Sequence, residues 1–94
     1  MTRLTVCVYD VRSDARRRKL HALLKQYGVP IQKSAFEARL SEAERRRLIA
    51  RARRLVDEKT DRFVVYVVAA SQEAQIACIG EPRPKIVVEE WFVI

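Results

Sequence analysis

One acidic residue, Asp10, has a position from which a carboxylate could bind a metal ion or act on a phosphate group. It ends the segment 3–10, whose alternating side chains predict a β-strand. Asp10 shares one face of that strand with an apolar row, made of Leu4, Val6 and Val8. A carboxylate at the end of a core strand, just before a helix, occupies a common place for functional groups.

Magnesium is the metal that such a group would hold, with water and phosphate oxygens as its other ligands. A single Asp10 is an incomplete magnesium site, which the Asp10 of a second copy would complete across a two-fold axis. The structural alternative stays open at this point. Asp10 would then accept hydrogen bonds from the backbone of turn 11–14, or pair with Arg16 or Arg17.

Basic residues form two clusters that could bind nucleic-acid phosphates. The first cluster is Arg12, Arg16, Arg17, Arg18 and Lys19. It stands at the start of a predicted helix, where cations oppose the helix dipole and free N–H groups favour phosphate. The second cluster places six arginines within ten residues: Arg45, Arg46, Arg47, Arg51, Arg53 and Arg54. Such an arginine excess favours phosphate binding, although either cluster could instead be a solvated helix face.

The histidine, the cysteines and the aromatic residues give weaker evidence for a catalytic or binding site. His21 has no visible nucleophile partner, and Cys7 and Cys78 are each embedded in apolar residues, so we expect buried free thiols. Aromatic residues are scarce, and several are expected in the core: Tyr27, Phe36 and Tyr66. Contact with a duplex backbone is therefore better supported than stacking on unpaired bases.

Length and composition describe one small basic domain. The chain has 94 residues, a formal charge of +7 and 49% apolar residues, which excludes a two-domain enzyme. No apolar run approaches the roughly 20 residues that span a bilayer, and the N-terminus begins a strand pattern instead of a signal peptide. We therefore expect a cytoplasmic protein without membrane contact.

Two helices are predicted between the strands. Ser13 or Asp14 caps the first, whose apolar positions have helical spacing and which ends before Gly28 at the C′ position. Those apolar positions are Leu20, Leu23, Leu24 and Tyr27. A capping box, Ser41 with Glu44, opens the second helix, which is expected to run to about Asp57.

The strands complete a familiar order. Further strands are predicted over 31–40, 63–70, 75–79 and 85–94. Strand, helix, strands, helix, strands is the order of an α+β ferredoxin-like βαββαβ sandwich, here a single domain over 1–94. Residues 29–40 supply either two strands, the first very short, or one bent strand with a bulge. One sheet face is left open, and we expect residues 81–94 to contact a second copy or another protein, with a strand packed on the same chain as the alternative.

With these residues in view, the sequence resembles the CRISPR-associated Cas-two family over nearly its whole length. The matching segments are Val8-Tyr9-Asp10-Val11, the basic helix over 14–20, residues 32–37 and the pair Ile79-Gly80. The resemblance implies a homodimer through the open sheet face, with the C-terminal strand paired to the partner's sheet. It also implies magnesium-dependent cleavage of single-stranded RNA or double-stranded DNA at the paired Asp10 residues. Neighbouring positions linked to that site in the family match Tyr9, Arg17, Ser34 and Phe36.

The resemblance further implies a role in CRISPR spacer acquisition, as a scaffold for the Cas-one integrase. In this role the protein binds duplex DNA phosphates without reading sequence, and whether it is also an enzyme stays open. The residues expected to bind nucleic acid are Arg12, Arg16, Arg17, Arg18, Lys19, Lys33, Arg46 and Arg47. The alternative function is that of a ferredoxin-like toxin-type ribonuclease or an RNA-binding module.

Overall fold

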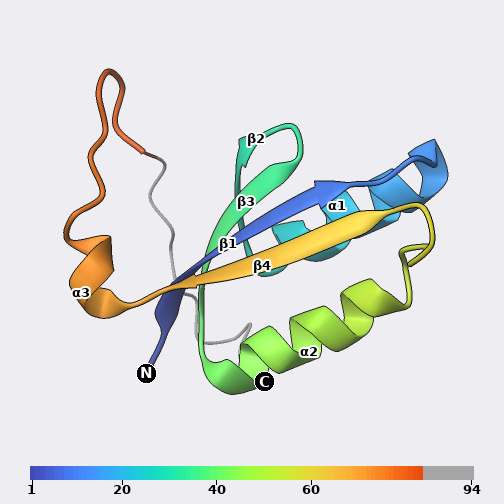
Figure 1. Cartoon of the computed structure of the whole chain (residues 1–94), viewed down its shortest axis with the longest axis horizontal. Coiled ribbons are helices and arrows are strands. Elements are labelled where there is room, and N and C mark those ends of the chain that lie inside the picture. The colour runs from blue at the N-terminus through green and yellow to red at the C-terminus, as the bar shows by residue number, and fades with distance from the viewer. Residues whose placement is uncertain (84–94) are drawn as a thin grey trace.

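A computed structural model describes residues 1–83 as one antiparallel sheet with two helices packed on one face (Figure 1). The elements are β1 (Arg3–Asp10), α1 (Asp14–Lys25), β2 (Gly28–Gln32), β3 (Ala35–Leu40), α2 (Glu42–Arg53), β4 (Arg62–Val68) and α3 (Ala70–Glu73). The strand order is β2-β3-β1-β4. This order confirms the expected ferredoxin-like arrangement. The predicted strand over 85–94, and most of the segment 81–94, lie outside the described residues.

Both main helices begin where the sequence predicts. The Ser13 hydroxyl accepts a hydrogen bond of 3.2 Å from the backbone N–H of Arg16, which caps α1. At α2, Glu44 N–H donates to the Ser41 hydroxyl over 3.1 Å, and Ser41 N–H donates to the Glu44 carboxylate over 2.8 Å. The capping box is therefore complete.

The second helix ends earlier than expected, at Arg53 and not near Asp57. Its last turn tightens, because the N–H of Arg54 bonds to the third carbonyl before it, and that of Leu55 does the same. Leu55 and Val56 lie beyond the helix and still pack against the core. Apolar side chains therefore continue the helical pattern past the point where the backbone leaves it.

The segment 29–40 forms two strands, which decides between the two expected arrangements. A two-residue turn at Lys33 and Ser34 joins β2 to β3, with a register shift between Pro30 and Gln32. The expected C′ role of Gly28 is wrong, because Gly28 begins β2 and its φ is not positive. Glycine is required there for space, since a Cβ would collide with the backbone carbonyl of Glu37.

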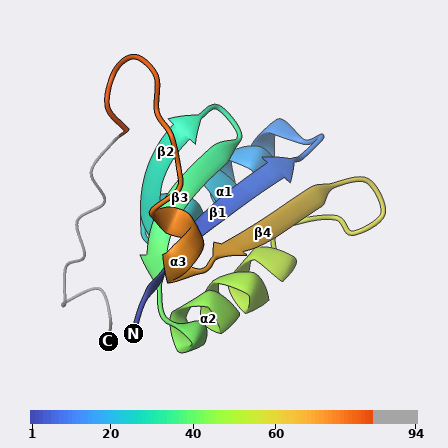
Figure 2. The same cartoon turned by 60° about the vertical axis from the view of Figure 1, so that its left-hand side comes forward.

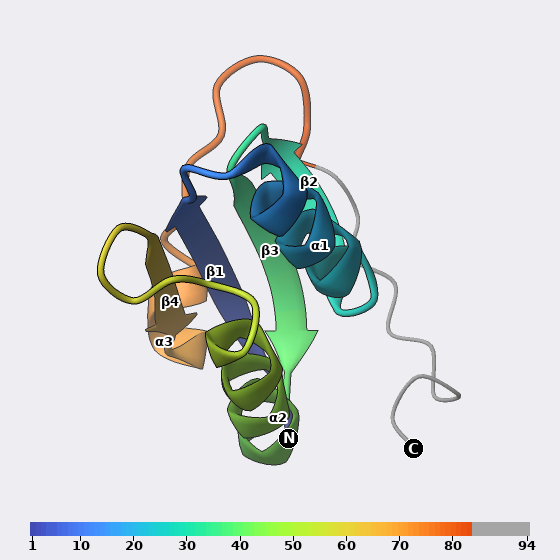
Figure 3. The same ribbon diagram turned by 90° about the vertical axis from the view of Figure 1, so that its right-hand side faces the viewer.

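The core lies between the sheet and the two helices, which Figure 3 shows on the same side of it. Odd-numbered side chains of β1 and even-numbered ones of β3 enter this core. Its main members are Cys7, Tyr9, Val11, Leu20, Leu23, Leu24, Phe36, Ala38, Leu40, Leu48 and Ala52. No helix in residues 1–83 is long and apolar enough to cross a membrane.

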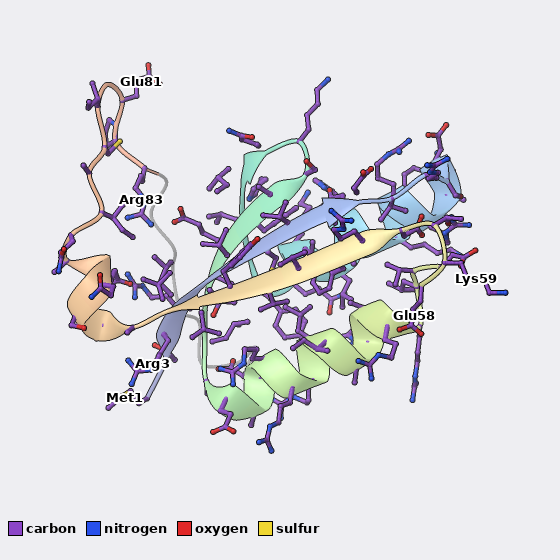
Figure 4. All side chains as sticks on the ribbon, viewed as in Figure 1. Met1, Arg3, Glu58, Lys59, Glu81 and Arg83 are labelled. Carbon is purple, nitrogen blue, oxygen red and sulfur yellow. The ribbon has the colours of Figure 1, made fainter. Side chains whose placement is uncertain are left out.

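The segment 70–83 partly covers the opposite face of the sheet. The strand predicted over 75–79 is wrong: α3 and an irregular loop follow β4 instead (Figure 2). Glu73 of α3 pairs with Arg39 at 2.7 Å, and Arg83 pairs with Glu37; Figure 4 shows Arg83 directed from the loop toward the sheet. This cover leaves Leu4 only 1% exposed.

Candidate functional site

The uncovered part of this face carries the candidate site. Three cross-strand pairs of β1 and β4 form it, which we call the open strip: Val6 with Tyr66, Val8 with Val64 and Asp10 with Arg62. Tyr66 is 57% exposed and Val8 37% exposed, so the expectation that Tyr66 lies in the core is wrong. Tyr66 shares a strand face with Val64 and Val68, the face turned away from the helices. An apolar surface therefore ends in a carboxylate.

Asp10 is exposed at the end of this strip. Among residues 1–83 no ion pair or side-chain hydrogen bond engages its carboxylate, so the pairing with Arg16 or Arg17 that stayed open from sequence does not form. The same residues contain no cluster of three or more His, Cys, Asp or Glu that could hold a metal ion. One copy thus supplies one carboxylate, and a magnesium site requires ligands from elsewhere.

Tyr9 and Phe36 lie on the other side of the sheet from Asp10. They are 3% and 1% exposed, and their rings stack with centroids 6.5 Å apart. The Tyr9 hydroxyl donates to the Lys33 carbonyl over 2.9 Å, and burial raises the pKa of Tyr9 although the nearby Arg17 charge opposes this. His21 packs edge-on against Phe36, with ring centroids 5.1 Å apart. These two aromatic residues therefore position backbone and do not face the open strip.

Arg17 and Ser34 also make contacts that fix turns. The Arg17 guanidinium donates to the Val11 carbonyl over 2.7 Å and pairs with Asp14 in the first turn of α1. The Ser34 carbonyl accepts from Tyr9 N–H over 3.0 Å, which extends the pairing of β1 into the β2–β3 turn. The five residues predicted around the active site thus divide into one exposed carboxylate and four groups that position its surroundings.

Asp61 is the acidic residue that the sequence analysis missed. Its carboxylate has no exposed side-chain surface and binds Arg16 through both oxygens, at 2.8 Å and 3.2 Å. It also accepts from the backbone N–H groups of Arg12 at 3.0 Å and Asp57 at 2.9 Å. The Arg16 hydrogen bond, with these backbone bonds, holds the pKa of Asp61 well below its ordinary value. Asp61 makes the contacts that the sequence assigned, as one alternative, to Asp10.

The pattern of β4 carries a signal for Asp61. An antiparallel partner of β1 that begins at residue 62 places residue 61 beside the β1–α1 turn, where N–H groups are free. The carboxylate at that point joins three segments: the β1–α1 turn, the first turn of α1 and the α2–β4 loop. A fixed turn after β1 also fixes where Asp10 stands.

The predicted phosphate-binding cations differ in whether a carboxylate pairs with them. Arg16 is engaged by Asp61, Arg17 by Asp14, and Arg46 by Glu42 at 2.7 Å. The others are exposed and have no ion pair within residues 1–83: Arg12, Arg18, Lys19, Lys33 and Arg47. This second group carries part of the uncompensated charge of α1, α2 and the turns beside them.

The two cysteines do not form a reactive pair. Both are free; Cys7 is buried in the core, and burial raises its pKa to about 12. The expected burial of Cys78 is wrong, because it is exposed on the loop after α3. Its thiol donates to the Glu81 carbonyl over 3.1 Å.

Comparison with known proteins places this architecture in a family. The family model described as CRISPR associated protein Cas2 matches residues 2–76, most of the chain. The chain belongs to the Cas2 family. A Cas2 endonuclease of Thermus thermophilus is 45% identical over 84 residues, covering 89% of this chain and 90% of the relative. A Cas2 endoribonuclease of Rhodospirillum rubrum is 33% identical over 94 residues, covering 100% of this chain and 75% of the relative.

Solved structures similar to this chain have the same fold. A hypothetical protein from Thermus thermophilus superposes with a TM-score of 0.78 at 41% identity, covering 90% of this chain and 100% of its own. Streptococcus pyogenes Cas2 gives 0.70 at 27% identity, with 82% and 99% covered. A chain of a partial Cas6-RT-Cas1–Cas2 complex gives 0.65 at 26% identity, with 84% and 91% covered. Both Asp10 and Asp61 lie within the residues that the Cas2 family model matches.

Proposed function

We propose that this Cas2 protein is a homodimeric scaffold that holds duplex DNA and assembles with Cas1 during spacer acquisition. One observation carries the proposal: exposed cations that have no carboxylate partner within residues 1–83 gather at the start of α1 and along α2. On surface helices, acidic residues three or four positions away normally balance such charges. Here α1 carries a single acidic residue, Asp14, and that residue pairs with Arg17.

Phosphate recognition by these groups has a clear physical signature. Each cation that neutralises a phosphate releases condensed counterions, so affinity falls steeply as salt rises. Contacts to phosphate and sugar carry no sequence information, so changing the bases leaves affinity almost unchanged. The absence of exposed aromatic side chains on α1 and α2 favours a duplex backbone over unpaired bases.

The homodimer and the Cas1 partnership rest on separate observations. The open strip exposes Val8 of β1 and Tyr66 of β4. Such an apolar surface is stabilised when a second copy covers it. A structural neighbour of this chain comes from a complex that contains Cas1 and Cas2. We infer that the dimer presents its basic helices to DNA while Cas1 binds elsewhere on it.

A magnesium-dependent phosphodiesterase is the second candidate function. The specific observation is Asp10, an exposed carboxylate without an ion pair, within residues 1–83, at the end of an apolar strip. A copy of Asp10 from each protomer would hold magnesium, which polarises phosphate and activates water when bound. Tyr9, Arg17, Ser34 and Phe36 then act as positioning residues through the turns they fix. Relatives named endonuclease and endoribonuclease support the same chemistry.

One experiment separates the two candidates. Wild type and Asp10→Asn are incubated with labelled duplex DNA or single-stranded RNA, with magnesium or with chelator, and binding and cleavage are followed together. Salt-sensitive duplex binding by both proteins without cleavage supports the scaffold alone. Magnesium-dependent cleavage by wild type, lost in Asp10→Asn, establishes the nuclease and its substrate. Cleavage that survives in Asp10→Asn contradicts a catalytic Asp10.

A charge-matched control sharpens this test. Glu58→Gln removes one negative charge from an exposed side chain on the α2–β4 loop, whose carboxylate faces Arg53 at the end of α2. It is expected to cleave like wild type. For DNA, Arg47→Ala is expected to weaken duplex binding roughly tenfold at low salt and to reduce the salt dependence by about one ion. Duplex affinity that stays the same between about 50 mM and about 200 mM salt would overturn the scaffold proposal.

A further inference from the structure

We propose that the groove between α1 and α2 is a docking site for an acidic, amphipathic helical segment of a partner protein. The groove has a volume of about 380 Å³. The two helices that border it lie on one side of the sheet (Figure 3), and the open strip is on the other side. The residues that line it are Lys19, Ala22, Leu23, Gln26, Arg51, Arg54 and Leu55. Its location and its chemistry both differ from those of the Asp10 site.

The floor of the groove is aliphatic. Leu23 is buried, Leu55 is half-buried and packs against the core, and Ala22 is exposed between them and solvent. The small side chain of Ala22 leaves room above the two leucines. This space suits leucine, isoleucine or methionine side chains of an approaching helix, which would pack along the groove as a third helix.

The rim of the groove is cationic. Lys19, Arg51 and Arg54 line it, and none of the acidic residues that the structure describes does. None of the three forms an ion pair within residues 1–83. Three like charges around one groove repel one another, and carboxylates of a partner segment would relieve that repulsion.

Arg51 is already held in place for such a partner. Its guanidinium donates to the Tyr27 hydroxyl at 3.1 Å and to Gln26 Oε1 at 3.2 Å, and it stacks over the Tyr27 ring at 5.7 Å. These neutral contacts leave its charge unneutralised. Because the side chain is fixed before binding, less conformational entropy is lost when a carboxylate pairs with it.

The same contact argues for a protein in preference to a nucleic acid. Arg51 lies over the Tyr27 ring, which also packs against the core, so the ring is a poor platform for a base, and the floor is aliphatic. Phosphate groups would meet the rim but gain nothing from Leu23 and Leu55. An acidic helix with apolar residues at i, i+3, i+4 and i+7 satisfies rim and floor together.

The test is a methyl NMR titration of the full chain with a synthetic 16-residue helical peptide, built of Glu with Leu at that spacing. The expected result is saturable shifts of the Ala22, Leu23 and Leu55 methyl signals. A peptide of the same composition in scrambled order is expected to give no such shifts. Ala22→Tyr fills the space above the floor at an exposed position and is expected to weaken peptide binding at least roughly tenfold.

Two charge reversals on α2 and its end separate this groove from the DNA surface. Arg54→Glu is expected to weaken the peptide roughly tenfold, whereas Arg47→Glu, outside the groove, leaves peptide affinity unchanged and weakens duplex DNA. Equal peptide affinity for Arg54→Glu, Ala22→Tyr and wild type overturns the proposal. It is also overturned if duplex DNA shifts the same floor methyls and displaces the peptide, because the groove is then a nucleic-acid site.

Discussion

Tyr9 and Asp10 are neighbours in the chain, yet they serve opposite faces of the same strand. Tyr9 is 3% exposed, and its hydroxyl is bound to the Lys33 carbonyl. Asp10 is exposed, and no ion pair engages it in the part of the chain that the structure describes. On the sheet face that packs against α1 and α2, which we call the helix face, the side chains are selected by packing in the core. On the open strip, the side chains are free to contact a second copy or a ligand.

The short motif at the end of β1 therefore combines two roles. Val8-Tyr9-Asp10-Val11 alternates between the two faces, so its members cannot meet at one point. Tyr9 and Val11 anchor the strand end, and Asp10 is the group that this anchoring presents. Substitutions on each face test this division.

Phe36→Ala should cause the largest loss of stability. The ring is 1% exposed and contacts both Tyr9 and His21, so its removal leaves a cavity at the centre of the helix face. We expect a loss of about 3–5 kcal/mol in the free energy of unfolding, measured by urea denaturation. A loss below about 1 kcal/mol would show that the helix face tolerates cavities, and would contradict the claim that packing limits its residues.

Asp61→Asn should destabilise the fold less than Phe36→Ala does. It should lower the melting temperature by on the order of 10 °C. The amide keeps one acceptor oxygen, while its NH₂ group faces donors on Arg16, Arg12 or Asp57. Asp57→Asn, whose exposed carboxylate accepts only a loop N–H from Lys59 within residues 1–83, is the matched control and should melt close to wild type.

The Asp61 contribution should depend on pH in a defined direction. Because the folded-state pKa is lowered, chiefly by the Arg16 hydrogen bond, the contribution is complete above the ordinary carboxyl value of about 4. It then declines as the pH falls toward the folded-state pKa. The difference in melting temperature between wild type and Asp61→Asn should therefore be constant from about pH 7 to about 5 and shrink below about 4. A difference that grows on acidification would contradict this sign.

Tyr66→Glu should disrupt association and leave the fold almost unchanged. The side chain is 57% exposed, so we expect a change in monomer stability within about 0.5 kcal/mol. A charge at the centre of the open strip should shift the protein from dimer to monomer in analytical ultracentrifugation. Ile31→Glu, at a 36% exposed position on β2, is the control and should leave the oligomeric state unaltered.

Asp10→Asn should have the smallest effect on folding. The carboxylate has no ion pair to lose within residues 1–83, so unfolding should change by less than about 0.5 kcal/mol. Duplex binding should tighten slightly, because a negative charge near phosphate is removed. Thermal melting and fluorescence anisotropy of the same preparations measure both. A strong destabilisation would place Asp10 with Asp61 among the structural carboxylates.

Local signals predicted most of the fold. Ser13 and the Ser41–Glu44 capping box mark helix starts because their hydrogen bonds span only three residues. The alternation in β1 identified the face that carries Asp10. Interactions between residues this close in the chain can be predicted from the sequence.

The errors arise where distant segments decide. Gly28 is explained by the carbonyl of Glu37 on the neighbouring strand, and not by the helix that precedes it. The exposure of Tyr66 and of Cys78 depends on which part of the sheet the segment 70–83 covers. Asp61 gains its role only when β4 aligns beside β1. The β4 pattern marks the position of Asp61, and the contacts of the other residues leave no periodic pattern in the sequence.

The two borders of the sheet differ in a way that limits assembly. At β2, Pro30 lacks a backbone N–H and stands beside a register shift, which hinders any further strand from adding there. At β4, residues Arg62–Val68 form a regular run that pairs only with β1 within residues 1–83. Within residues 1–83, β4 is therefore the border where a further strand can add. A second copy that added a strand along β4 would occupy the free border of both copies, so growth would end at a closed pair and would not propagate into a fibre.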